Sequence, residues 1–272
     1  IVDFDKVTLP NGVQKVFTAV PDGIWETWWT PQDGTHHNKI ITLANVKKVI
    51  ADNVIENGQL THRLYVLASD GPYEYWWQDG GDGIHKQRLS NINDPVAMVK
   101  TKTGGVEQLY TATAGAVFES WWQPGQGVQT SPIINISQND IVDIDKETSP
   151  SGIQQLYTAT KNNGIWESKW GQGSLTHAKI VNSLSDVRRI EKRTASDGTN
   201  QLYAATSGLV QEYWWKPGAS GGSTLIVASD IKDIDKTVSG SAQQLYTATG
   251  PNVLETWWGN GSIQTAEIAS FD

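Results

Sequence analysis

The sequence of 272 residues contains no cysteine and a single methionine. The absence of cysteine excludes disulfide bonds, catalytic thiolates and zinc sites built on thiolates, and it is compatible with an oxidising or a reducing compartment. No apolar stretch approaches the roughly 18–20 residues that a membrane-spanning helix needs. The composition therefore predicts a soluble globular protein without thiol chemistry and without a helical membrane span.

Basic residues are outnumbered by acidic ones. The chain has 21 Lys and Arg against 29 Asp and Glu, which gives a formal net charge of -8 and a pI near 5.1. Its Lys and Arg residues form no dense block. Because nucleic acids and anionic membranes attract positively charged surfaces, the sequence predicts neither as a partner. A neutral or cationic small-molecule ligand is easier to accommodate.

Tryptophan, by contrast, is abundant and follows a repeated phrase. One copy reads QLYTATAGAVFESWW over residues 108–122, and six such copies contain all 13 Trp of the chain. The acidic residue recurs 43 to 48 residues apart, a period typical of propeller blades or solenoids. Its six positions are Glu26, Glu74, Glu119, Glu167, Glu212 and Glu255.

Within each repeat the hydrophobic residues alternate, and Gly, Pro, Ser or Asn separate four short segments. The pattern predicts four antiparallel strands per repeat and almost no helix. Six such units arranged radially make an all-β, six-bladed β-propeller, which protects its strand edges by closing the ring. A β-helix is the main alternative, but its rungs are usually shorter. We expect one domain over residues 1–272, with repeats at roughly 1–46, 47–94, 95–139, 140–185, 186–229 and 230–272.

The second and third strands of each repeat form a hairpin whose register can be deduced. With residues 113–116 as the turn of the third repeat, Tyr110 lies opposite Glu119 and Gln108 lies opposite Trp121. Alternation places all four side chains on one face. Since both faces of a blade pack on its neighbours, these polar groups point into a cleft between blades, where they must be paired or bind a ligand. The corresponding set in the second repeat is Arg63, Tyr65, Glu74 and Trp76.

This arrangement resembles the Aleuria-type fungal and Ralstonia-type bacterial fucose-binding lectins. The shared features are a Tyr, a Glu nine residues later, a Trp three residues further on and a Gly-containing turn, and the likeness extends over all six repeats, with one extra residue in the fourth. The resemblance implies a six-bladed propeller that binds each sugar between adjacent blades. It also implies that an Arg two residues before the Tyr, the repeated Glu and aromatic side chains hold the sugar, a combination suited to hydroxyls and to the apolar face of a sugar.

Only the second repeat retains both polar partners of that family. The Arg position reads Lys15, Arg63, Gln108, Gln155, Gln201 and Gln244, and Val128 and Ser174 stand where the family has a further Trp. We therefore expect the main sugar site at Arg63, Tyr65, Glu74 and Trp76. Further candidate ligand-binding residues are Lys15, Glu26, Trp28, Gln108, Glu119 and Trp121.

Structural roles compete with these assignments. The repeated Glu residues would accept hydrogen bonds from backbone or Trp N–H groups of the next blade, the Gln residues would satisfy the adjacent Glu, and the Trp residues would pack between blades.

Three D-x-D-K sequences begin at Asp3, Asp143 and Asp233. They could suggest calcium, but no loop supplies the six or more oxygen ligands that calcium prefers. Alternating Asp residues on the solvated side of a strand are the better interpretation, so we assign no metal and no cofactor.

The first two repeats differ from the rest. They contain four of the five His and both cationic versions of the Arg position. One-sided divergence favours a second function. Some fungal proteins similar to these lectins catalyse a hetero-Diels-Alder cyclisation in natural-product biosynthesis, so the resemblance also implies an aromatic, tropolone-derived reactant and a terpenoid as possible ligands. Such an enzyme needs an aromatic pocket and a hydrogen-bond donor or cation rather than a nucleophile. Its candidate catalytic residues here are Lys15, His62 and Arg63, near the first two blades.

The sequence predicts the lectin, with the enzyme as the alternative. The six retained Glu residues and the close spacing favour the lectin, whereas the loss of the repeated Arg favours the enzyme. A propeller that only docks proteins has no specific support.

The sequence also bears on location. It begins at Ile1 rather than Met, which fits removal of a leader. The sequons Asn135-Ile136-Ser137 and Asn260-Gly261-Ser262 fit a secreted eukaryotic protein. We therefore predict secretion.

Overall fold

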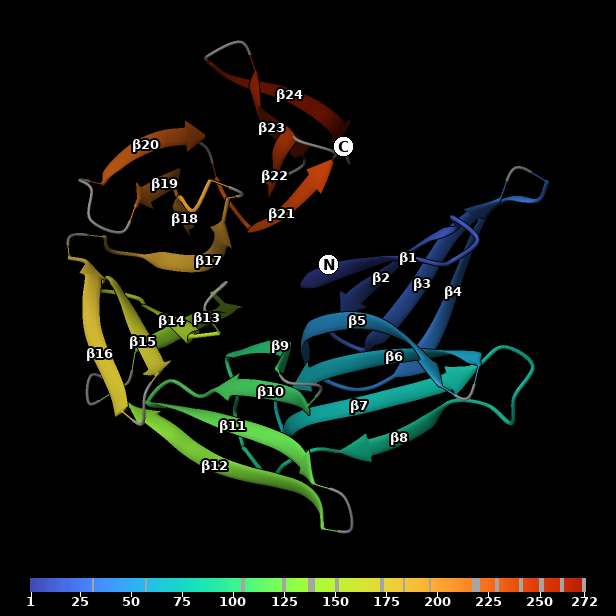
Figure 1. The fold of residues 1–272 in the computed structure, drawn as a ribbon. Coiled ribbons are helices and arrows are strands. Elements are labelled where there is room, and N and C mark those ends of the chain that lie inside the picture. Colours follow the sequence, from blue (N-terminus) through green and yellow to red (C-terminus); the bar gives the residue numbers. More distant parts are fainter. Residues whose placement is uncertain are drawn as a thin grey trace. The chain divides into compact units, whose positions relative to one another are not determined.

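The fold consists of six antiparallel sheets of four strands each (Figure 1). The computed structural model describes all residues except 31, 57, 104–105, 124–125, 137–139, 150–151, 172–173, 183, 196, 217–220, 228–229, 240–241, 250–251, 260–261 and 271–272. The described part of the chain contains 24 strands and no helix. Each sheet comes from one predicted repeat, in the β-propeller arrangement that the sequence predicts.

Residues 1–139 form one compact unit of three blades. Its first blade contains β1 (Asp3–Thr8), β2 (Gln14–Val20), β3 (Gly23–Thr30) and β4 (Gly34–Thr42). The second contains β5 (Val46–Glu56), β6 (Gln59–Ala68), β7 (Gly71–Gln78) and β8 (His85–Arg88), and the third contains β9 (Ala97–Thr103), β10 (Val106–Ala112), β11 (Ala116–Gln123) and β12 (Gly127–Asn135).

Residues 140–272 form a second compact unit, also of three blades. The fourth blade contains β13 (Ile141–Thr148), β14 (Gln154–Thr160), β15 (Ile165–Gly171) and β16 (Ser174–Val181). The fifth contains β17 (Val187–Thr194), β18 (Asn200–Thr206), β19 (Val210–Trp215) and β20 (Gly222–Val227), and the sixth contains β21 (Asp233–Ser239), β22 (Ala242–Ala248), β23 (Asn252–Gly259) and β24 (Ser262–Ser270).

The boundary between the two units coincides with the predicted boundary between the third and fourth repeats. That all six repeats form one domain stays a prediction.

Within each unit, the first strand of a blade lies beside the first strand of the next. β1 contacts β5 and β5 contacts β9, and in the second unit β13 contacts β17 and β17 contacts β21. Apolar clusters fill the seams, by which we mean the interfaces between consecutive blades. For example, Phe17 and Ile24 of the first blade share one cluster with Val49 and Leu64 of the second. The alternating apolar residues of the sequence therefore supply contacts between blades as well as within them.

The aspartates of the D-x-D sequences act differently from the prediction. Asp3 and Asp143 are buried, with 5% and 2% of their surface exposed. Asp3 accepts a hydrogen bond from the backbone N–H of Val49 at 2.8 Å, and Asp143 accepts one from Ile190 at 2.9 Å. Both bonds cross to the next blade. The interpretation as solvated residues is wrong, because these carboxylates satisfy N–H groups on the edge strand of the neighbouring blade.

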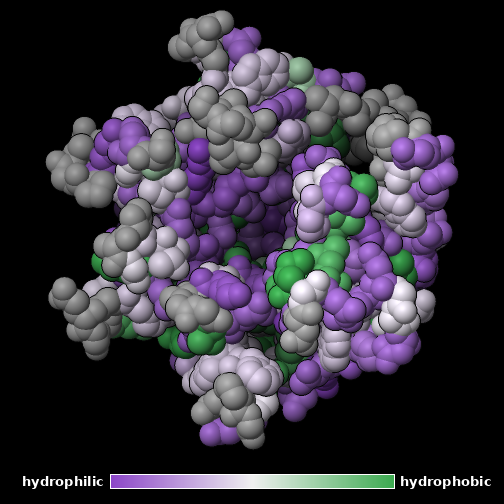
Figure 2. Space-filling model, turned by 45° about the vertical axis from the view of Figure 1, so that its right-hand side comes forward, coloured by the Kyte–Doolittle hydropathy of each residue, from purple (hydrophilic) through white to green (hydrophobic). Residues whose placement is uncertain are grey.

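Many large apolar residues in the described part of the chain are buried in these seams and sheets. On the face shown in Figure 2, hydrophilic residues predominate and hydrophobic residues form small separate patches. Among the described residues, no helix is long and apolar enough to cross a membrane. Ser137, Asn260 and Gly261 of the two sequons lie outside the described residues. Secretion stays a prediction.

Candidate functional site

The hairpin register deduced from the sequence is confirmed. Tyr110 pairs with Glu119 and Gln108 pairs with Trp121 between β10 and β11. In the second blade, Tyr65 pairs with Glu74 and Arg63 with Trp76 between β6 and β7. In the first blade, Lys15 pairs with Trp28, and Phe17 takes the Tyr position opposite Glu26. The predicted residues of each blade therefore share one face of its hairpin.

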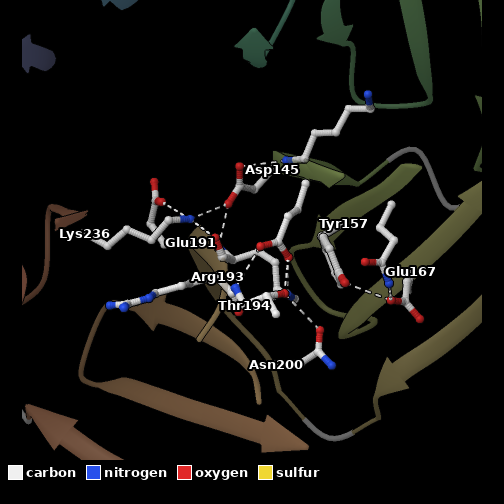
Figure 3. Close-up of polar contacts among 12 residues, drawn as sticks. Asp145, Tyr157, Glu167, Glu191, Arg193, Thr194, Asn200 and Lys236 are labelled. Carbon is white, nitrogen blue, oxygen red and sulfur yellow. Dashed lines mark hydrogen bonds and ion pairs between the residues drawn. The ribbon is translucent and has the colours of Figure 1, made fainter. Parts of the chain in front are cut away.

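In every blade the repeated Glu bonds the side chain at the Arg position, which is Lys15 in the first blade and Arg63 in the second. In four blades it accepts a hydrogen bond from the Gln that replaces the family's Arg; the pairs are Gln108 with Glu119, Gln155 with Glu167, Gln201 with Glu212 and Gln244 with Glu255. The hydroxyl of Tyr157 also donates to Glu167 at 2.8 Å (Figure 3). These donors come from the same blade, whereas the structural interpretation of the sequence expected N–H donors from the next blade. The Gln residues thus satisfy the Glu of their own blade.

A cavity of about 670 Å³ opens between the second and third blades. Six of the residues that the sequence selects line it: Arg63, Tyr65, Glu74, Trp76, Gln108 and Trp121. Additional lining residues include Glu56, Lys100, Lys102, Glu107 and Trp122. The cavity is therefore an interblade cleft of the predicted kind, with charged groups and aromatic rings in its wall.

Arg63 lies at the centre of the polar wall. Its Nη1 atom is 3.1 Å from Glu74 Oε1 and 3.4 Å from Glu107 Oε2, and its Nη2 atom bonds Glu56. Glu107 belongs to the third blade, so the guanidinium joins carboxylates from both sides of the cleft. The side chain of Arg63 remains 22% exposed. One group of this cleft thus holds three acids and still faces the cavity.

Tyr65 and Lys100 complete the network. The Tyr65 hydroxyl donates to Glu107 at 3.0 Å, while the Lys100 ammonium bonds Asp52 and lies 4.9 Å from the centre of the Tyr65 ring. Burial raises the pKa of Glu74, and the nearby Glu107 carboxylate raises it further, although Arg63 opposes both. Burial acts to raise the pKa of Glu107 as well, but Lys100, Tyr65 and Arg63 outweigh it and the net shift is downward. The two carboxylates therefore differ in proton affinity.

The position of one Trp explains why this cleft is open. In three other seams, the Trp three residues after the repeated Glu packs against the preceding blade. Trp77 contacts Phe17 with ring centres 6.2 Å apart, Trp258 contacts Tyr203 at 5.8 Å, and Trp215 packs into the cluster that contains Tyr157. The equivalent Trp122 is 57% exposed and lies at the cavity instead. Without that ring in the seam, space remains for a ligand.

Part of the charge network in the cleft is structural. In the seam between the fourth and fifth blades, Lys192 bonds Glu147 and lies 5.3 Å from the centre of the Tyr157 ring. Lys100, Asp52 and Tyr65 repeat this arrangement in the seam between the second and third blades. Figure 3 shows Lys236 in a related role, bridging Asp145 and Glu191. A lysine on the first strand of a blade thus helps to hold that blade against the preceding blade.

The candidates of the first blade, and His62 of the second, lie outside the cavity. Lys15 forms an ion pair with Glu26 at 2.8 Å, and its ammonium is 5.7 Å from the centre of the Trp28 ring. His62 is 1% exposed and is enclosed by Asn53, Asp79 and Trp77. Of the three proposed catalytic residues, only Arg63 lines the cavity.

Every histidine of the chain stacks on a tryptophan. The five pairs are His36 with Trp28, His37 with Trp25, His62 with Trp77, His85 with Trp76 and His177 with Trp166, with ring centres 4.6 to 5.4 Å apart. His36 and His37 stack on different rings, as expected for neighbours on opposite faces of a strand. Among the described residues, no three or more His, Asp or Glu side chains are arranged so that they could hold a metal ion. The histidine excess of the first two repeats is therefore used in packing.

Sequence reasoning missed Glu56, Lys100, Glu107 and Trp122. Glu107 had a signal: it stands directly before the Arg position, where the other repeats have uncharged or imidazole side chains; these are Gln14, His62, Gln154, Asn200 and Gln243. Glu56 reaches the cavity because the β5–β6 hairpin is longer than its counterparts. Trp122 had no signal, because its sequence context matches that of the Trp residues that pack.

Comparison with solved structures supports the resemblance at the level of the fold. The chain superimposes on the BP39L lectin of Burkholderia pseudomallei with a TM-score of 0.72 and 12% identity, covering 98% of this chain and 84% of that one. For the fucose-binding Aleuria aurantia lectin, a six-bladed β-propeller, the TM-score is 0.67 and the identity 15%. That match covers 99% of this chain and 96% of the lectin. For AofleA of Arthrobotrys oligospora, the TM-score is 0.65 and the identity 13%, and the match covers 99% of this chain and 87% of that one.

No protein-family model matches the sequence, and no curated protein is significantly similar to it. The comparisons thus establish the lectin-like propeller fold.

Proposed function

We propose that this protein is a carbohydrate-binding lectin that holds a sugar in the cavity between its second and third blades. The observation that carries the proposal is the wall of that cavity, where Arg63 and Glu74 lie beside Trp76 and Trp121. Charged hydrogen-bonding groups suit sugar hydroxyls, and indole rings suit the apolar face of a sugar. A volume of about 670 Å³ is in the range of small-ligand sites.

The similar structures support this assignment. Structures of the Aleuria aurantia lectin include a complex with Fucα1-6GlcNAc, and the SapL1 lectin, with a TM-score of 0.65, is bound to α-methyl fucoside. In this chain only the second repeat has the Arg that the resemblance associates with sugar binding. The retained Arg and the open cleft therefore occur at the same seam, which favours one principal site there.

The cyclase alternative has less support. It requires the divergent residues of the first two repeats to meet in one pocket, but Lys15 is paired with Glu26 and His62 is enclosed beneath Trp77. The cavity instead lies between the second and third blades. We therefore retain the lectin as the proposed function.

The test compares two equivalent glutamates. A glycan array identifies a ligand, and titration calorimetry then measures its affinity for the unmodified protein and two variants. Glu74→Gln should lower affinity at least tenfold, because it removes a carboxylate of the cavity. Glu212→Gln makes the same change in the fifth blade, whose seam Trp is packed, and should leave affinity within twofold. Equal affinity of the Glu74 variant and the unmodified protein would exclude this site.

A further inference from the structure

We infer that the cavity between the second and third blades prefers a sugar that carries a protonated amino group over its neutral counterpart. The inference rests on the proposed function and specifies the class of sugar.

The charges around the cavity leave an acidic excess. Four carboxylates take part in one connected network with two cations: Glu56, Glu74, Glu107 and Asp52 contact Arg63 or Lys100. Lys102 also lines the cavity but is exposed to solvent. Three acids and three bases therefore line the cavity itself, and the excess of one acid comes from Asp52, which pairs with Lys100 but does not line the cavity. A ligand cation in this partly enclosed space would relieve the repulsion between carboxylates.

Two of these acids have no acidic counterpart in the seam between the fourth and fifth blades. The seam between the fourth and fifth blades uses one lysine and one acid, Lys192 and Glu147, for the role that Lys100 and Asp52 have here. Glu56 and Glu107 are additions to that arrangement. Their carboxylates are 41% and 26% exposed and converge on the guanidinium of Arg63. Arg63, which stands where the fourth blade has Gln155, offsets one of these two negative charges, so the charge network beside the cavity gains one acid net.

Other groups of the wall fit an amino sugar. Gln108 lines the cavity, and the hydrogen bond from its amide to Glu119 fixes the orientation of its side chain. Trp76, Trp121 and Trp122 present aromatic surface, which attracts both sugar C–H faces and cations.

Titration calorimetry with two matched probes tests the inference. Methyl β-glucosaminide is cationic below the pKa of its amine, and its N-acetyl derivative is neutral with the same ring. At pH 6.5 and low salt, the amine should bind at least tenfold more tightly, and the difference should shrink at high salt. Glu107→Gln and the more exposed Glu56→Gln should each reduce this preference at least threefold.

Asp94→Asn is the control, because it removes one acidic charge from a side chain that is 88% exposed and lies outside the cavity. Asp94 has a positive φ of 49°, a backbone conformation that Asn also adopts. This variant should keep the preference.

The outcomes separate the two proposals. If the N-acetyl sugar binds as well as the amine or better, or if only neutral sugars such as methyl α-fucoside bind, the inference is overturned and the lectin proposal stands. If Asp94→Asn weakens amine binding as much as Glu107→Gln, the effect is general charge and the inference is also overturned. If no sugar binds at all, the lectin proposal fails and the inference fails with it.

Discussion

At the scale of single residues, buried carboxylates bind backbone N–H groups across the seams. Asp143 is 2% exposed and accepts the N–H of Ile190. A buried N–H left without a partner costs about 1–3 kcal/mol. The acids of the D-x-D sequences therefore stabilise contacts between blades, a role that the alternation of Asp residues in the sequence does not reveal.

Replacement of Asp143 tests this role. Asp143→Ala should lower the free energy of unfolding by about 1–3 kcal/mol because Ile190 N–H loses its acceptor. Asp143→Asn retains one acceptor oxygen and should cost less. Asp230→Ala, at a side chain that is 61% exposed, should change stability by less than about 0.5 kcal/mol. Urea unfolding measures all three, and an Asp143→Ala variant as stable as Asp230→Ala would contradict the buried role.

His62 predicts a pH dependence of stability. Burial lowers the pKa of His62, the Lys15 charge lowers it further, and Asp79 partly opposes them. The unfolded chain therefore binds the proton more readily than the folded chain. Stability from this group is fully present above the unfolded pKa, near 6.5, and is lost as the pH falls through the lower folded value. His177, whose pKa burial also lowers, adds in the same direction.

Urea unfolding at pH 7, 6 and 5 checks this effect. The unmodified protein should lose stability over this range. His62→Gln should lose less, because Gln binds no proton in either the folded or the unfolded chain. An unchanged pH dependence in the variant would show that the His62 proton is not coupled to folding.

At the scale of elements, the hairpins depend on glycines with different surroundings. Gly164 precedes β15 with φ +74°, and a Cβ atom there would lie 1.9 Å from the Val181 carbonyl oxygen. Gly152, in the turn before β14, has φ +81° and open space around it. The backbone conformation alone disfavours an L side chain at both, by roughly 1–2 kcal/mol. Only Gly164 adds a clash with the neighbouring strand.

A pair of alanine variants separates the two effects. Gly152→Ala should lower the free energy of unfolding by about 1–2 kcal/mol, from conformation alone. Gly164→Ala should cost at least twice as much, because β15 and β16 must also move apart. Thermal or urea unfolding gives both values, and equal losses would mean that the strand pair adjusts to the methyl group without cost.

Much of this level was predictable from the sequence. The period-2 pattern and the short turn at residues 113–116 fix the β10–β11 register, so the pairing of Tyr110 with Glu119 followed from local rules. The contributions of Glu107 and Lys100 to the Arg63 network did not follow, because they depend on how two blades pack. Pairing within a hairpin is local information, whereas partners across a seam require the three-dimensional arrangement.

At the scale of the whole molecule, the repeats are similar in sequence but unequal in their seams. Trp77 is packed between Phe17 and His62, whereas Trp122 is 57% exposed at the cavity. The same sequence phrase therefore fastens one pair of blades and leaves another open. The number of ligand sites cannot be counted from the number of repeats.

Truncating these two Trp residues should have opposite consequences. Trp77→Ala should lower the free energy of unfolding by about 3–5 kcal/mol, the usual cost of removing a packed aromatic side chain. Trp122→Ala should lower it by less than about 1 kcal/mol but should weaken ligand binding, since its ring lies at the cavity. Urea unfolding and calorimetry on both variants check the contrast; a large stability loss from Trp122→Ala would place that ring in the seam.

The aspartate contacts also bear on how such a chain can grow. Asp3 reaches the strand 46 residues later, and Asp143 the strand 47 residues later, each using an acceptor on one repeat and a backbone N–H on the next. Every amino acid except proline supplies that N–H. A duplicated repeat therefore already contains the backbone donor that the Asp of the preceding repeat requires. Tandem duplication of this unit would thus lengthen the array with interfaces in register from the outset, and later substitutions, as at Arg63 and Glu107, could specialise one junction while the others kept the chain folded.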